Sequence, residues 1–206
     1  MRTLTQVMTA ATAVAALTLA GCGSATEDGS GTGDAENTAS EVSSEHNTAD
    51  VDFAAGMIPH HAQALEMVDM ADGRPLDPEV EELASAIAEA QQPEIETLTG
   101  WLETWGEDVP DVDSMTAKDM ESMEGMDGME GMMSAMSMRQ LENAPDQAFQ
   151  DVWLALMLAH HKGAVAMAET EIAEGENPEA VALAEDIKDS QSAEIETMKS
   201  LIGGGA

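Results

Sequence analysis

MIPHHAQALEM, residues 57–67, returns 100 residues later as MLAHHKGAVAM, residues 157–167. The register holds without an insertion when residues 51–102 are set against residues 151–202, with 16 identities in 52 positions. Both copies contain Gln-x-x-Glu-Ile-Glu-Thr near their ends, at residues 91–97 and 191–197. The chain therefore contains an internal duplication, and each copy carries an adjacent histidine pair, His60-His61 or His160-His161.

The composition of the two copies predicts helices. Alanine, leucine, methionine and glutamate dominate them, and all four residue types favour helices. Capping residues, prolines and glycines mark four segments: about Asp50 to Ala71, a helix opening at Asp77-Pro78, about Pro145 to Ala173, and a helix opening at Asn177-Pro178 that ends before Gly203. Pro59 and Pro93 fall inside two of these helices, where we expect local kinks and not helix ends.

A single helical hairpin cannot cover its own apolar stripes. We therefore predict an all-α protein in which two duplicated hairpins, residues 50–105 and 145–202, pack as one antiparallel four-helix bundle. The bundle domain would span residues 50–202, and residues 106–144 would form a Met-rich acidic linker between the hairpins.

The region before the first copy resembles an export signal. Arg2 precedes an uncharged apolar run, and Leu-Ala-Gly-Cys at residues 19–22 looks like a bacterial lipobox. We expect residues 1–21 to be a lipoprotein signal peptide and Cys22 to be lipidated, which would anchor the protein to the outer face of the cell membrane. The alternatives are an ordinary signal peptide with an incidental cysteine, or an uncleaved helix whose apolar run is short for a bilayer.

Residues 22–49 are small, polar and acidic, so they predict a flexible tether. His46 lies in this tether, and we assign it no role. The net charge of −34 disfavours nucleic acid as a partner, because such a chain repels phosphate backbones. The same charge would keep any exported protein soluble, so it is weak evidence for a particular metal.

The histidines lie beside the apolar stripes of their helices. At about 100° per residue, His60 and His61 flank the stripe that contains Met57, while Glu94 lies on the buried stripe of the following helix and Glu96 faces away. The second copy repeats this arrangement with His160, His161 and Glu194. Two interpretations remain open: a metal site, or a polar layer in which Glu94 and Glu194 hydrogen-bond the histidines and fix the helix register.

Methionine near these histidines points to a soft metal. Thioether sulfur is a poor ligand for hard cations, so Met beside His favours Cu(I) or Ag(I). The relevant methionines are Met57, Met67, Met157 and Met167. The competing interpretation is that they fill the core, as methionine at helical spacing usually does.

The linker has nine methionines in the 24 residues from Met115 to Met138. Its glycines and acids predict an exposed, flexible segment, and Met-x-x-Met spacing lets several sulfurs converge on one Cu(I). We expect a soft-metal loop whose ligands are Met120, Met123, Met126, Met129 and Met132. The alternatives are a sacrificial oxidant trap and a low-complexity segment without a role.

Together the two motifs resemble a known family. Met-x-x-His-His-x-x-Ala-x-x-Met followed by Gln-x-x-Glu-Ile is similar to the secreted bacterial domain of unknown function 305 (DUF305), and the likeness covers residues 51–102 and 149–202. The resemblance implies a ferritin-like four-helix bundle outside the cytoplasm, with copper binding in some members. Leu98 stands where the motif has methionine and Met198 keeps it, so the halves need not bind metal equally.

The sequence favours a membrane-tethered protein that sequesters or delivers Cu(I) or Ag(I), with a metal-exchange partner that is unknown. One alternative is a structural or interaction lipoprotein whose histidines are satisfied core groups. Another is a ferritin-like metal oxidase, but Glu-x-x-His motifs are missing, because Met57 and Met157 stand three residues before His60 and His160. We recognise no catalytic constellation and expect no enzyme.

Overall fold

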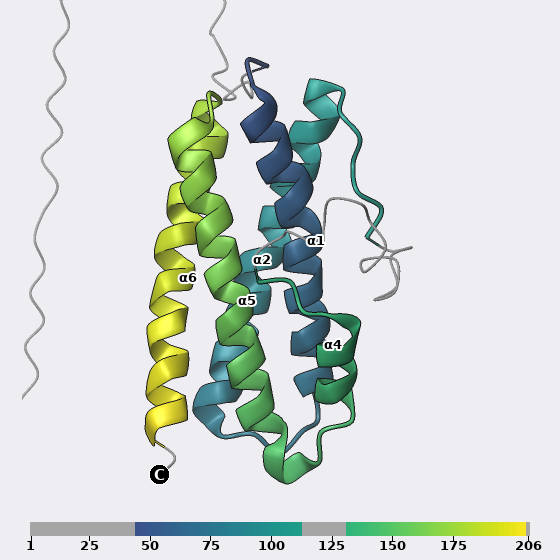
Figure 1. Cartoon of the computed structure of the whole chain (residues 1–206), viewed down its shortest axis with the longest axis vertical. Helices are drawn as coiled ribbons and strands as arrows, with labels where there is room; N and C mark the ends of the chain where they lie inside the picture. The colour runs from purple at the N-terminus through teal and green to yellow at the C-terminus, as the bar shows by residue number, and fades with distance from the viewer. Residues whose placement is uncertain (1–43, 113–130, 205–206) are drawn as a thin grey trace, which may run out of the picture. The chain divides into compact units, whose positions relative to one another are not determined.

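The computed structural model describes residues 44–112 and 131–204, and the regular structure of these residues is helical throughout. Their helices are α1 (Thr48–Ala71), α2 (Pro78–Trp105), α4 (Ala135–Glu142), α5 (Asp146–Glu174) and α6 (Pro178–Gly204). Helices α1 and α2 form one hairpin, α5 and α6 form the other, and α1 packs against α5 in the opposite direction (Figure 1). The predicted all-α bundle of two hairpins is confirmed.

Local signals explain where the long helices begin. Asn47 caps α1 by accepting hydrogen bonds from the N–H groups of Ala49 and Asp50, and the Asp50 carboxylate accepts one from the Asn47 N–H in return. Asn177 caps α6 by accepting hydrogen bonds from the N–H groups of Glu179 and Ala180. Helices α1 and α2 continue through Pro59 and Pro93, as expected.

The turns of the two hairpins are tied to each other by equivalent residues. Asp50, in the first turn of α1, accepts hydrogen bonds from the N–H groups of Glu176 and Asn177 at the start of α6. Its counterpart Gln150, in α5, accepts from the Asp77 N–H and donates to the Asp77 carboxylate at the start of α2. Each hairpin therefore holds the turn of the other one.

The bundle core consists of two apolar clusters. The α4 cluster is built around Met67, Trp153, Met157 and two residues of α4, Met138 and Leu141. The Trp101 cluster is built around Phe53, Met57, Leu98 and Trp101. On every long helix, the buried residues of one cluster precede the repeated polar motif and those of the other follow it. The core is therefore divided at the level of the histidines.

The structure corrects two expectations near the edges of the bundle. The end of the segment that we expected to be an exposed linker forms α4, in which Met138 and Leu141 are buried, because they complete the α4 cluster. His46, to which we gave no role, stacks on Trp105 with ring centroids 4.7 Å apart, so the chain is ordered before α1 begins.

Several expectations fall outside the described residues. They concern the signal peptide, the lipidated Cys22, most of the tether, and the linker methionines Met120, Met123, Met126 and Met129. Among the helices that the structure does describe, none combines the length and apolar character needed to cross a membrane.

Candidate metal centre

A polar layer separates the two apolar clusters. All four of its histidine side chains have 0% exposure, so the inward orientation predicted for both residues of each pair is correct. The layer also includes two buried glutamines and two partly exposed glutamates from the following helices. Its members are His60, His61, Gln91 and Glu94 and their counterparts His160, His161, Gln191 and Glu194.

The first histidine of each pair meets its counterpart. His60 on α1 and His160 on α5 lie with ring centroids 3.8 Å apart and ring planes inclined by 41°. One of these residues comes from each hairpin, so the duplication brings both copies to a single place. The sequence left open whether the copies form one centre or two, and this contact places the first histidines of both copies side by side.

The second histidine of each pair turns to its own hairpin. His61 Nε2 lies 2.7 Å from Glu94 Oε2, and His161 Nε2 lies 2.8 Å from Glu194 Oε2. The predicted hydrogen bond to histidine is confirmed for Glu194, whereas the short His61–Glu94 contact lacks the geometry of a hydrogen bond. The Nδ1 atoms of His61 and His161 are buried without a hydrogen-bond partner among the described residues. A carboxylate on one ring nitrogen orients an imidazole and leaves the other nitrogen available as a ligand.

The protonation state of His160 suits metal binding. Burial lowers the pKa of His160 well below its usual value, and the proximity of His60, His161 and His61 lowers it further. The nearby backbone of His60 opposes this shift only in part. His160 is therefore neutral at physiological pH, and a neutral imidazole is the form that binds a metal ion.

Predicted methionine ligands lie on both sides of the polar layer. Met67 and Met157 belong to the α4 cluster, whereas Met57 belongs to the Trp101 cluster and Met167 packs against it. Met57, Met67 and Met157 are fully buried, and Met167 is partly buried. Of these four predicted ligands, each side of the layer thus receives one from each copy. This placement is compatible with ligands and equally with core filling.

The glutamines of the layer are a further polar feature. Both side-chain amide atoms of Gln91 and the Oε1 atom of Gln191 are buried without a hydrogen-bond partner in the described part of the chain. Buried polar atoms without partners are costly, so they mark places where a ligand or a rearrangement is favourable. In the sequence, the sign that these glutamines matter was their occurrence at equivalent positions of the two copies.

Within residues 44–112 and 131–204, no group of three or more His, Cys, Asp and Glu side chains is arranged to hold a metal ion. The layer as it stands is therefore not a site for a metal that needs three such ligands. A centre at His60 and His160 would draw its remaining ligands from thioethers, which select Cu(I) and Ag(I) over harder cations.

Sequence reasoning missed one contact beside the layer. The buried side chain of Gln63 binds the backbone of Met133, which lies just before α4. Met132, the one predicted linker ligand that the structure describes, precedes this contact and is partly buried. A difference between the repeats, Gln63 in one and Gly163 in the other, was the available signal.

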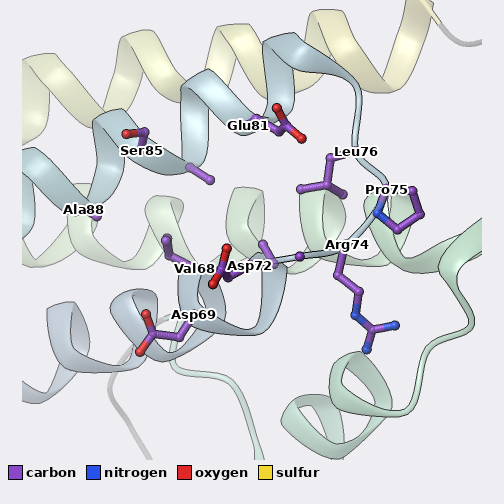
Figure 2. Close-up of a pocket in the computed structure, with 12 residues that line it drawn as sticks. Val68, Asp69, Asp72, Arg74, Pro75, Leu76, Glu81, Ser85 and Ala88 are labelled. Carbon is purple, nitrogen blue, oxygen red and sulfur yellow. The ribbon is translucent and has the colours of Figure 1, made fainter.

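A surface hollow of about 740 Å³ lies away from the histidines, at the turn between α1 and α2 (Figure 2). Acidic residues Asp69, Asp72 and Glu81 line it together with Arg74. The Arg74 guanidinium binds Asp146 and two backbone carbonyls and lies over the Phe149 ring. Its charge is already engaged in holding α4 and α5, so we assign the hollow no ligand.

Residues 50–202 match the family model described as a domain of unknown function, DUF305. The chain belongs to the DUF305 family. A solved DUF305 fragment from Deinococcus radiodurans is 29% identical, with a TM-score of 0.64 over 76% of this chain and 97% of that one. A DUF305 structure from Streptomyces coelicolor, described provisionally as a secreted protein, is 32% identical, with a TM-score of 0.63 over 76% and 93% of the two chains.

CopM is a structural neighbour with bound metal. Its Cu(II)-bound form is 32% identical to this DUF305 chain, with a TM-score of 0.63 over 76% of this chain and 97% of CopM. CopM has also been solved in Cu(I)-bound, silver-bound and apo forms. Metal binding is therefore found among proteins of this fold. No curated protein matches the chain in sequence.

Proposed function

We propose that this DUF305 protein binds Cu(I) or Ag(I) outside the cytoplasm and sequesters or delivers it. The observation that carries the proposal is the contact between His60 and His160, 3.8 Å apart by ring centroid and contributed by equivalent positions of the two copies. Two imidazoles at this distance, with methionines on either side of the layer, supply the nitrogen and sulfur donors that soft monovalent ions prefer. The copper and silver complexes of CopM support the same choice of metal.

The surrounding residues have distinct parts in this proposal. Glu94 and Glu194 orient His61 and His161, which hold the second nitrogen pair of the layer. Met57, Met67, Met157 and Met167 offer thioethers from both clusters. The linker methionines, from Met120 to Met132, capture the ion first and pass it to the bundle. A lipid on Cys22 keeps the protein at the outer face of the membrane.

The proposed role is binding, without catalysis. Ferritin-like oxidases need a carboxylate-rich pair of metal sites, whereas Glu94 and Glu194 each contact a single histidine of their own hairpin. A binding protein of this kind turns nothing over, and the ion leaves in the oxidation state in which it arrived. A metal-exchange partner would then receive it.

A structural role for the polar layer is the second candidate. The His161–Glu194 hydrogen bond satisfies part of the layer without a metal, and together with the short His61–Glu94 contact it would fix the register of each hairpin. Under this alternative, the four histidines matter for stability and the protein retains no metal.

An anaerobic Cu(I) titration against a competing chelator separates the two candidates. The test protein is residues 23–206, which include every described residue, and the variant has His60, His61, His160 and His161 changed to Ala. Competition by the parent chain that is reduced in the variant supports the metal centre. Circular dichroism checks that the variant is folded, and a second variant, with Met57 and Met157 changed to Leu, keeps the volume of the core while removing two thioethers. If the parent chain does not compete for Cu(I), the structural role holds.

A further inference from the structure

Equivalent positions one turn beyond the central histidines hold different residues in the two copies. Gln63 follows His60 by three residues, and Gly163 follows His160 by three. Both residues meet the same short segment, Gly131–Met133, which we call the strap. The strap crosses from one hairpin to the other at the level of the polar layer, and it breaks the twofold symmetry there.

The side-chain amide of Gln63 holds the strap by two hydrogen bonds, one through its oxygen and one through its nitrogen. The Met133 N–H donates to Gln63 Oε1 at 2.6 Å, and Gln63 Nε2 donates to the Met133 carbonyl at 3.0 Å. The Gln63 side chain is buried, with 2% of its surface exposed, so these two bonds satisfy a polar group that would otherwise be costly. A pair of opposed hydrogen bonds to one residue fixes both the position and the direction of the strap.

Gly131 lets the strap lie directly on the backbone of α5. Its φ is +89°, and a Cβ atom there would stand 2.6 Å from Gly163 Cα and 2.7 Å from the His160 carbonyl oxygen. No side chain fits at these distances, and the left-handed backbone also favours glycine. The strap is therefore seated against the turn of α5 that begins with His160.

The seated strap places a methionine against the α4 cluster. The Met133 side chain is partly buried against the α4 cluster, which borders the layer and includes Met67 and Met157. Met133 thus joins a side of the layer that already holds methionines from both copies, among them Met67 and Met157. It is not part of either repeat and was not among the predicted ligands.

We propose that Gln63 is a positioning residue for metal transfer, which holds the strap so that the Met133 thioether passes Cu(I) or Ag(I) to the His60–His160 pair. The inference rests on the proposed function of the centre. The step is a ligand exchange without a change of oxidation state: the bond from Met133 sulfur to the ion breaks as a bond from the layer forms. Thioether donors suit such a step, because they are neutral and need not lose a proton.

The test is the rate at which the protein, as residues 23–206, takes Cu(I) from a coloured chelator under anaerobic conditions. Gln63→Ala removes both hydrogen bonds to the strap, and Met133→Leu removes the sulfur while keeping the side-chain volume. We expect both variants to load Cu(I) more slowly than the parent chain, because the thioether that presents the ion is either released or absent. The amount of Cu(I) bound at equilibrium should stay near that of the parent chain.

Met138→Leu is the matched control, because Met138 is a buried methionine of the same region and belongs to α4 instead of the strap. It should load at the parental rate. Hydrogen exchange at the Met133 amide reports directly whether Gln63→Ala has released the strap. Parental or faster loading of Gln63→Ala or Met133→Leu would overturn the inference, since the strap would then be a passive cover or a barrier. If the parent chain itself takes no Cu(I), the proposed function fails and the inference fails with it.

Discussion

His60 and His160 occupy the same place in the two copies, and their rings lie in contact, 3.8 Å apart by centroid, between two helices that run in opposite directions. The approximate twofold relation between the hairpins therefore passes near this contact. A metal ion held here would depend on both copies at once.

Because the proposed centre needs both copies, substitutions of His60 and His160 should have strongly non-additive effects on Cu(I) binding. We expect His60→Ala or His160→Ala alone to weaken Cu(I) binding nearly as much as the double variant does, because either change leaves half of one centre. Competition titrations of the two single variants and the double variant measure this. Retention of half the parental stoichiometry in each single variant would instead indicate two separate sites.

The carboxylate of Glu94 should affect metal affinity through His61. Glu94→Gln weakens the hold on the His61 ring, so we expect Cu(I) affinity to fall by about 10- to 100-fold, as is usual for carboxylates behind histidine ligands. Glu96→Gln is the control, since Glu96 is exposed on the same helix and should bind as the parent does. Equal affinities for the two variants would remove Glu94 from the metal centre.

The shifted pKa values of the Asp50 and Glu171 carboxyl groups predict that the free energy of unfolding depends on pH. Burial raises the pKa of Asp50, but N–H groups of Asn47, Asn177 and Glu176 and a hydrogen bond with Glu171 outweigh it, so this pKa is lowered. Burial, together with the Asp50 carboxylate, raises the pKa of Glu171 to about 8. Glu171 is therefore protonated in the folded protein at neutral pH, and it can donate to the ionised Asp50.

The sign of the effect follows from proton uptake. Between the ordinary pKa of Glu171, 4.5, and about 8, the folded state binds more protons than the unfolded state, so the free energy of unfolding falls as pH rises. Glu171→Gln keeps a donor without titrating, and we expect it to flatten this slope and to raise the melting temperature at pH 8. Glu169→Gln, exposed on the same helix, should leave the slope intact. Calorimetry from about pH 5 to 9 distinguishes them, and an unchanged slope in Glu171→Gln would contradict the assignment.

Asn177 and Asp77 hold equivalent positions at the starts of α6 and α2, and we expect their replacement to lower the free energy of unfolding by different amounts. Asn177 caps α6 with two hydrogen bonds, whereas Asp77 makes no side-chain bond to its own helix. We expect Asn177→Ala to lower the free energy of unfolding by about 1 to 2 kcal/mol through the lost cap. Asp77→Ala should cost less, because it loses chiefly the contact with Gln150 near the surface. Urea denaturation of both variants tests the order.

Much of the fold could be predicted because its signals are local. Asp77-Pro78 and Asn177-Pro178 mark the starts of α2 and α6, and periodicity alone placed all four histidines inside. The fourth helix was expected to end before Gly203, but it continues to Gly204. Helix α4 was missed because it is only eight residues long and depends on packing by Met138 and Leu141.

The finer geometry of the site could not be predicted. Adjacent residues on a helix differ by about 100° in direction, so periodicity cannot say that His60 meets His160 while His61 meets Glu94. That choice depends on how α1 and α5 are rotated against each other. The hydrogen bond between Gln63 and Met133 joins residues 70 positions apart, and no local sequence pattern predicts such a contact.

The hydrogen bonds between each hairpin and the turn of the other restrict how the bundle can open. Asp50 secures the start of α6, and Gln150 secures the start of α2, so neither hairpin can swing away as a rigid body without releasing both ends. The polar layer lies between these fastened ends and separates two apolar clusters. Parting the hairpins to expose the buried histidines would therefore break hydrogen bonds at both ends of the bundle at once.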